Sequence, residues 1–153
     1  MYKEYHKCWY LMVLSKRDLE ASYSKIDAIL SELSKTASEL KDTTTNSSHL
    51  PDKMGSLISS KIDLENIIEY QKALFDSRNK RVEEKLEELK KSKDLSDIIY
   101  LLKFVSKFKV KEVAKVISYS REYTYDLISK IREQMKSIES EINESMKKKN
   151  ANF

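Results

Sequence analysis

The sequence predicts an all-α protein: a long, coiled-coil-like N-terminal helical hairpin, followed by shorter helices and one extended C-terminal helix. Only one glycine and one proline occur among 153 residues, so few positions interrupt a helix. Charged residues make up 35% and apolar residues 40% of the chain, a composition typical of long helices with one solvated face. Apolar residues also recur at spacings of three and four, the period of a helix.

The first predicted helix runs from Tyr2 to about Lys41. Near its start, Tyr5 and Trp9 broaden the apolar face, so this end is expected to pack against more than one neighbour. The short run CWYLMVL is preceded by mixed charges and is interpreted as a buried helix face, not a signal peptide. No apolar run approaches the ~20 residues that cross a bilayer. The residues of its seam, spaced as in a coiled coil or long hairpin, are Met12, Leu19, Tyr23, Ile26, Leu30, Leu33, Ala37 and Leu40.

A second long helix is predicted from near Ser56 to about Lys91. Between the two helices a loop is expected near 42–56, because Pro51 and Gly55 fall there among Thr and Ser residues. The later half of the second helix is highly charged and is expected to protrude as a stalk. The two helices and their loop are predicted to form one helical arm, residues 1–91. Its apolar positions, compatible with antiparallel packing on the first helix, are Leu57, Leu64, Ile68, Phe75, Val82 and Leu89.

The second predicted unit spans 94–148 and contains three helices. Asp94 begins the first, where the helix dipole favours a negative side chain. The second helix covers 110–117, and the third begins after a break at 118–120. The apolar positions of the first helix are Leu95, Ile98, Ile99, Leu102 and Val105. The inward positions of the other two are Val113, Ala114 and Ile117, then Thr124, Leu127, Ile128 and Ile131.

The second and third of these helices have the sequence form of a helix-turn-helix. Ala114 leaves room for two helices that cross at a steep angle, and Ser120 is suited to cap the third helix. Ile117, Tyr119 and Leu127 are expected to close the small core between the helices. Helical corners that bind no DNA share this pattern, so the pattern alone leaves both interpretations open.

The third helix is predicted to continue well beyond the corner. A helix from Arg121 to about Lys147 is ~40 Å long at 1.5 Å per residue. Its apolar stripe requires a cover, which either the N-terminal hairpin or a second copy of the chain supplies. The residues of that stripe are Ile128, Ile131, Met135, Ile138, Ile142 and Met146.

The corner and its flanks resemble a known family. The segment YLLKFVSKFKVKEVAKVISYSREYTYDLISKI is similar to the fourth region of bacterial sigma factors. It resembles more closely the helix-turn-helix of small phage-encoded, sigma-like transcription regulators related to the autolysin regulatory protein and late-gene activators. Upstream, YKEYHKCWYLMVLSKRDLEASYSKIDAIL and DKMGSLISSKIDLENII resemble the helical N-terminal half of those proteins. The resemblance implies a sigma-like helix-turn-helix with an extended recognition helix.

The sequence departs from the family pattern at three positions. Ser118 stands where the turn usually has glycine, so a side chain must adopt a conformation that favours glycine. Lys109 replaces the usual Ser or Thr cap of the second helix, and Thr124 replaces an inward aliphatic residue of the recognition helix.

The residues expected to read DNA lie at the start of the third helix. Arg121 can donate a forked pair to guanine, and Glu122 can accept from cytosine. Lysines near the second helix are expected to bind phosphates at its N-terminus. Tyr123 is expected to reach a phosphate or to pack inward. The candidate base-reading residues are Arg121, Glu122, Tyr125 and Asp126. The candidate phosphate-binding residues are Lys107, Lys109, Lys111, Lys115, Ser120, Tyr123 and Lys130.

Charge supports this interpretation. The whole chain carries a mild +4. Between Lys103 and Arg121, however, six bases face one acid, Glu112, a local net charge of +5 that is typical of a phosphate-binding surface. The alternative is that these lysines only increase solubility.

Other chemistry finds little support in the sequence. It has no glycine-rich phosphate loop and no catalytic constellation, so an enzyme is not expected. Cys8 is the only cysteine, which excludes an internal disulfide, suits a reducing cytosol and is interpreted as a core residue. His6 and His49 have no second ligand at a suitable spacing, so no metal site and no cofactor are expected.

The expected function is therefore that of a sequence-specific, double-stranded DNA-binding transcription regulator, encoded by a phage or prophage and acting in the bacterial cytoplasm at the nucleoid. A homodimer held by the long helices is expected, since one such unit gives a small interface. The alternative is a helical adaptor that binds another protein, such as host RNA polymerase, without reading DNA.

Overall fold

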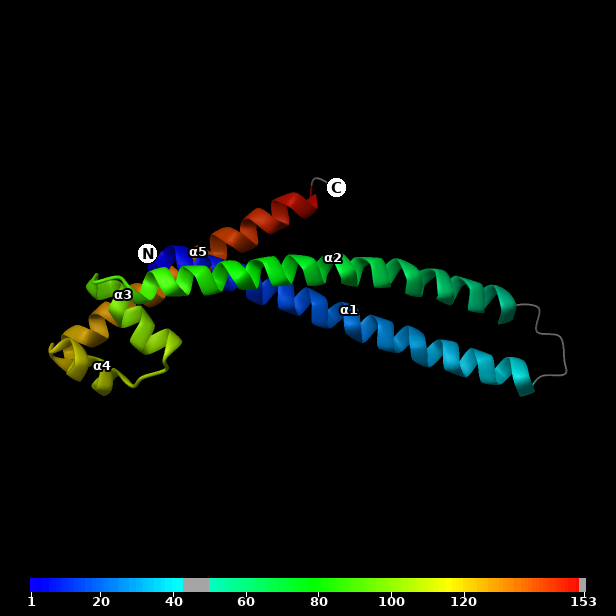
Figure 1. The fold of residues 1–153 in the computed structure, drawn as a ribbon, viewed down its shortest axis with the longest axis horizontal. Helices are drawn as coiled ribbons and strands as arrows, with labels where there is room; N and C mark the ends of the chain where they lie inside the picture. Colours follow the sequence, from blue (N-terminus) through cyan, green and yellow to red (C-terminus); the bar gives the residue numbers. More distant parts are fainter. Residues whose placement is uncertain (43–49, 152–153) are drawn as a thin grey trace. The chain divides into compact units, whose positions relative to one another are not determined.

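The computed structural model describes residues 1–42 and 50–151, and every regular element in these ranges is helical (Figure 1). The all-α class is thereby confirmed. Two helices of 41 residues each, α1 (Tyr2–Asp42) and α2 (Leu50–Lys90), come first. A short α3 (Leu95–Tyr100) continues directly into a π-helical turn, Leu101–Val105. The chain then forms α4 (Val110–Ile117) and the long α5 (Arg121–Ala151).

The start of α2 differs from the prediction. The helix begins at Leu50, six residues before Ser56, so Pro51 and Gly55 belong to its first turns and not to a loop. Proline fits there because the first turn of a helix needs no N–H donor and shares the φ angle that proline imposes. Gly55 has open space around it and meets no neighbour within 4 Å. Of the predicted loop, residues 43–49 lie outside the described ranges.

The chain divides into two compact units, and the division falls inside both long helices. The first unit joins Met1–Met12 to the chain from Arg78 onward, and the second comprises Val13–Ser77. The predicted boundary between residues 91 and 94 does not coincide with this division.

In the second unit, the later part of α1 and the earlier part of α2 run alongside each other (Figure 1). Lys53 Nζ of α2 lies 3.7 Å from Glu32 Oε2 of α1. The buried positions of α1 include the small polar residues Ser15, Ser22 and Thr36. Ser22 lies seven positions after Ser15, and Thr36 lies two such intervals after Ser22. Small side chains let two helices approach closely. Because these three are polar, the apolar periodicity of the sequence does not identify them. By contrast, the predicted seam residues Tyr23, Leu30 and Leu40 are exposed, so the prediction is wrong for these three positions.

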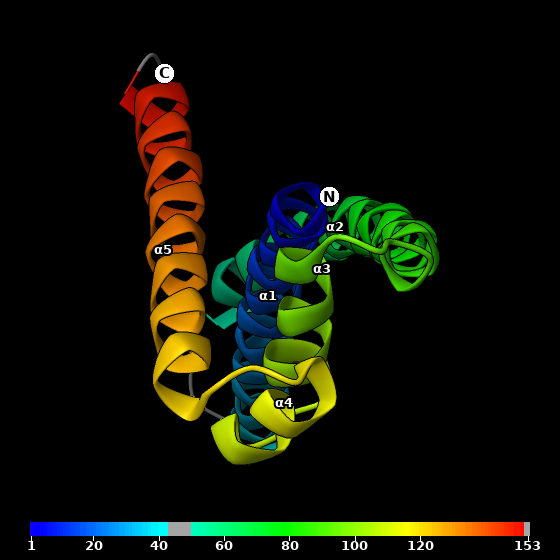
Figure 2. The ribbon, with the colours of Figure 1, turned by 90° about the vertical axis from the view of Figure 1, so that its left-hand side faces the viewer.

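The core of the first unit draws one or more residues from each of its helices. Leu89 of α2, Ile99 of α3 and Val113 of α4 are almost fully buried, as is Ile128 of α5. Figure 2 shows α3, α4 and the beginning of α5 grouped at one end, with α5 extending away from them. Five helices therefore share one apolar cluster within this unit.

The apolar stripe of α5 is covered by the start of α1. Ile142 retains only 7% exposure, and Met135, Ile138 and Met146 are half-buried. Polar contacts follow the same line, since Tyr10 Oη donates to Asn143 Oδ1 at 3.0 Å. The sequence left two possible covers for this stripe, the N-terminal hairpin and a second copy of the chain. In the structure, the chain's own N-terminal helix covers it.

A buried carboxylate fastens the beginning of α1 to α3. Asp97 is 2% exposed, and its Oδ1 accepts a hydrogen bond from the Tyr2 backbone N–H at 2.8 Å. Its Oδ2 accepts a second bond from the Ser92 hydroxyl at 2.5 Å. A buried charge is tolerated only when hydrogen bonds satisfy it, and here both oxygens are satisfied.

An aromatic cluster grows around this attachment. Tyr2 stacks on Tyr100 with ring centroids 5.5 Å apart, and Tyr5 meets the same ring edge-on at 5.7 Å. His6 is 1% exposed and its Nδ1 lies 2.9 Å from the Tyr100 hydroxyl. Burial raises the pKa of Tyr100 above its usual value and lowers the pKa of His6, while nearby Glu139, with Oε1 3.8 Å from His6 Nε2, acts in the opposite direction on the histidine.

Two turns near α4 use left-handed backbone without glycine. Lys107 and Ser118 both have φ of 61°. Each follows the end of a helical segment, and backbone bonds close the turns: Phe108 N–H donates to Leu102 at 2.9 Å, and Tyr119 N–H to Ala114 at 3.2 Å. Such bonds across a left-handed residue are the usual way to satisfy the last carbonyls of a helix.

Replacement of Ser118 by glycine is expected to stabilise the protein by about 0.5–1 kcal/mol, because glycine adopts this conformation without steric cost. Ser118→Val is expected to destabilise it by about 1–2 kcal/mol, since a β-branched residue fits left-handed backbone poorly. Urea denaturation followed by circular dichroism measures both. Ser106→Gly is the matched control, because Ser106 has a right-handed φ of −88° and should gain nothing. Equal unfolding midpoints for the two Ser118 variants would contradict the expectation.

Acidification is expected to destabilise the first unit through His6. Its pKa in the folded protein lies below the ordinary 6.5, so the unfolded chain takes up the proton first. The contribution to stability is complete above about pH 6.5 and declines as the pH falls below it. Urea unfolding measured from pH 8 to pH 5 should show this decline, and His6→Gln should remove it. Glu139→Gln should enlarge it, since the carboxylate favours the protonated ring; a smaller decline in that variant would count against the assignment.

Candidate nucleic-acid interface

The corner between α4 and α5 is formed by a small residue at the helix crossing and by polar residues whose side chains are hydrogen-bonded. Ala114 is 7% exposed beside fully buried Val113, which allows the two helices to approach. At the start of α5, Ser120 Oγ accepts the Tyr123 N–H at 3.1 Å, so the expected N-cap is confirmed. Thr124 is fully buried, and its hydroxyl donates to the Ser120 carbonyl at 2.7 Å. This bond satisfies the hydroxyl group at a buried position.

One predicted core residue is placed wrongly. Ile117 and Leu127 are half-buried as expected, but Tyr119 is 48% exposed. Its ring packs on the ring of Tyr123, with centroids 5.2 Å apart. The left-handed turn at Ser118 directs the following residue away from the core, an effect that residue type alone does not reveal. Tyr123 is exposed too, so the inward alternative for that residue is excluded.

All eleven candidate DNA-contacting residues are exposed. Glu122, Tyr125 and Asp126 occupy the first two turns of α5 with Arg121, and Lys130 follows one turn later. Around α4, four lysines are exposed, and neither these nor Arg121 has an ion-pair partner among the described residues. These lysines are Lys107, Lys109, Lys111 and Lys115.

Two basic residues near the corner have structural contacts instead. Lys103 is half-buried, and its Nζ donates to the Phe108 carbonyl at 3.2 Å, so it stabilises the turn before α4. Arg132 lies over the Phe104 ring, 5.8 Å from its centroid. Of the six bases counted between Lys103 and Arg121, Lys103 therefore does not belong to the exposed basic surface.

The N-terminus of α4 has no side-chain cap. Lys109 occupies the cap position in extended backbone and makes no capping hydrogen bond. The first N–H groups of a helix lack partners within the helix and carry a partial positive charge. An anion can therefore be bound there by backbone N–H groups and the neighbouring lysines together.

The contact between Asp97 and Tyr2 was not predicted from the sequence. Asp97 gave one signal, a charged residue on the apolar side of a short predicted helix, but its partner Tyr2 is 95 positions away.

In the parts of the chain that the structure describes, no cluster of His, Cys, Asp or Glu has an arrangement that could hold a metal ion. None of the described helices has the length and apolarity needed to traverse a bilayer.

Comparison with known proteins adds no relative to this description. The chain matches no family model, no curated protein and no solved structure.

Proposed function

We propose that the protein is a sequence-specific, double-stranded DNA-binding transcription regulator of the sigma-like, phage-encoded kind. In this proposal α4 and α5 act as a helix-turn-helix, with α5 as the recognition helix. The observation that supports it best is the open first turn of α5, where Arg121 and Glu122 are exposed beside the four exposed lysines around α4.

The proposed division of labour follows from side-chain chemistry. Arg121 reads guanine through two parallel hydrogen bonds, and Glu122 accepts from the amino group of cytosine. Tyr125 and Asp126 extend the base-reading surface along α5. Lys109 and Lys111, together with the uncapped N–H groups of α4, bind backbone phosphates and fix the register of the helix on the duplex.

We further propose that the protein acts as a homodimer through the second unit. The start of α1 packs along the apolar stripe of α5 and buries Ile142, so we do not place the dimer surface on that stripe. The second unit instead exposes large apolar side chains of α2, among them Ile58, Ile62, Ile67 and Tyr70. A dimer places two recognition helices on one site, the usual way for a small unit to reach useful affinity.

The reading and positioning roles are separable by mutation. The probe is a duplex that the wild-type protein selects from a random-sequence pool. Arg121→Ala is expected to reduce discrimination against single base changes by about 1–3 kcal/mol at one position only. Lys109→Ala is expected to weaken binding to all duplexes and to lower the slope of log K against log salt by about 0.9. Lys93→Ala, at an exposed lysine outside the corner, should change neither quantity. Selection of no duplex from the pool would support the adaptor function instead.

The dimer prediction is tested by molar mass. Light scattering of the wild-type protein at micromolar concentration should give the mass of two chains. Ile58→Glu combined with Ile62→Glu, at two exposed positions on the same face of α2, should give one chain, because a buried carboxylate at an apolar interface is strongly unfavourable. Lys72→Glu, at an exposed polar position of the same helix, is the matched control and should remain dimeric. A wild-type mass of a single chain excludes the dimer.

A further inference from the structure

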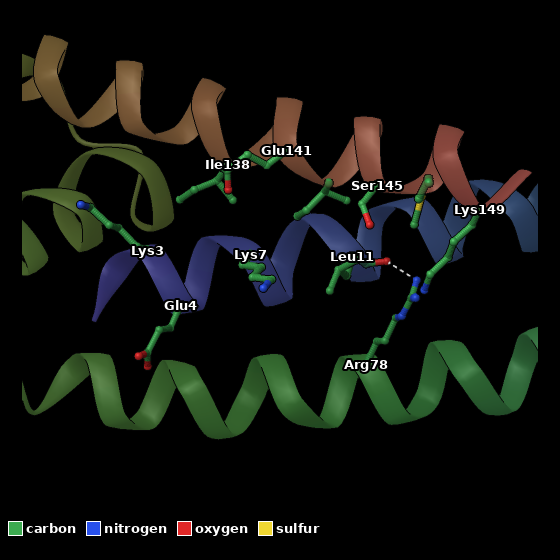
Figure 3. Close-up of a pocket in the computed structure, with 11 residues that line it drawn as sticks. Lys3, Glu4, Lys7, Leu11, Arg78, Ile138, Glu141, Ser145 and Lys149 are labelled. Atoms are coloured by element: carbon green, nitrogen blue, oxygen red, sulfur yellow. Dashed lines mark hydrogen bonds between the residues drawn. The ribbon is translucent and has the colours of Figure 1, made fainter. Parts of the chain in front are cut away.

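A second basic surface lies in the first unit, in a groove that the proposed DNA contacts do not use. The groove has a volume of about 600 Å³ and lies along the start of α1 (Figure 3). One wall comes from the later part of α5, and the other includes Arg78 of α2. All of its residues belong to the same compact unit.

The floor of the groove is apolar. Leu11 of α1 and three residues of the α5 stripe line it, namely Ile138, Ile142 and Met146. Figure 3 shows Leu11 on α1 and Ile138 on the facing helix α5. Although α1 buries Ile142, the other three side chains remain half-exposed toward the groove.

The rim of the groove carries an excess of cations. Lys3 and Lys7 project from α1 and Lys149 from α5, and none of the three has an ion-pair partner among the described residues (Figure 3). Arg78 Nη1 donates to the Leu11 carbonyl at 2.9 Å, which holds its charge beside the floor. Of the two acids at the rim, Glu4 is already paired with Lys85, at 3.6 Å, and Glu141 is exposed.

We infer that this groove binds an acidic amphipathic helix of another protein. An apolar stripe of such a helix would cover Leu11, Ile138 and Met146, while carboxylates on its flanks would pair with the lysines at the rim. From Lys3 to Leu11 the groove extends along α1 for about 12 Å at 1.5 Å per residue, which is about two helical turns. That length accommodates apolar anchors at positions i, i+3 or i+4, and i+7 of a bound helix.

The chemistry of the groove favours this occupant over two others. Nucleic acid would pair with the lysines but would leave the apolar floor without a partner. A second copy of the end of α5 would bring Lys147, Lys148 and Lys149 against a rim that is already positive. An acidic amphipathic helix satisfies both the floor and the rim.

The test uses a fluorescein-labelled helical peptide of about 20 residues, with leucines in one stripe and glutamates on both flanks. Its fluorescence anisotropy is measured with the full-length protein. The wild type should bind it, and should not bind the matched peptide in which every glutamate is replaced by lysine. Lys7→Glu combined with Lys149→Glu should weaken binding at least about tenfold. Met146→Gln should weaken it severalfold by removing an apolar contact, whereas Lys136→Glu, outside the groove, should have no effect.

Other results would overturn the inference. Equal binding of both peptides, or loss of binding only in the lysine variants and not in Met146→Gln, would indicate a general electrostatic surface. Stronger binding of a random duplex DNA than of the acidic peptide, lost on the same lysine changes, would assign the groove to nucleic acid. A two-chain mass that falls to one chain in Lys7→Glu with Met146→Gln would assign it to a second copy. Arg121→Ala should leave peptide binding unchanged, so failure of the DNA proposal does not affect this result.

Discussion

The first unit depends on the attachment of the start of α1 to α3 through Asp97. That carboxylate accepts from the Tyr2 N–H and the Ser92 hydroxyl in a site almost closed to water. With Tyr2 held there, Tyr5 and His6 reach Tyr100, and the next turns of α1 cover the stripe of α5. Removal of the carboxylate would leave two donors without a buried acceptor, which is costlier than the loss of a surface bond.

Because this attachment places the start of α1 over α5, it affects both proposed binding surfaces. Residues 1–12 pack on the inner side of α5 within the first unit. The two ends of α5 therefore differ in the side chains that they expose. Its beginning exposes Arg121 and Glu122 at the α4 corner, and its later part forms one wall of the basic groove. One helix thus carries both proposed binding surfaces, and each surface has its own set of cations.

Most helices and their inner faces were predictable from local signals. Apolar periodicity identified the long helices, and the chemistry of Ser120 and Ala114 identified the corner, because caps and close crossings depend on residues a few positions apart. The inward position of Thr124 followed from the same periodicity, and its hydrogen bond to Ser120 is equally local.

The incorrect or missing predictions concern non-local or conformational effects. Asp97 and Tyr2 are far apart in the sequence, so their pairing has no local signal. Pro51 and Gly55 lie among Thr and Ser residues, which predicts a loop, but proline also fits the first turn of a helix, where it is found. The pattern of a helix-turn-helix predicts Tyr119 in the core, but the left-handed backbone of Ser118 directs it outward. Of the candidate site, the exposure of all eleven residues agrees with a surface role, but Lys103 shows that a count of charges along the sequence does not distinguish a free cation from one bound to a carbonyl.

The π-helical turn at Leu101–Val105 has a consequence for the geometry of the corner. A π turn accommodates one residue more than an α turn between the same flanking positions, and each residue of an α-helix rotates the chain by about 100°. Tyr100 precedes this turn and faces α1, whereas Lys107 and α4 follow it. The extra residue therefore sets the rotational phase between the aromatic cluster and the basic corner. Deletion of a single residue within 101–105 would keep this segment helical, yet it would redirect the lysines of the corner relative to the aromatic cluster.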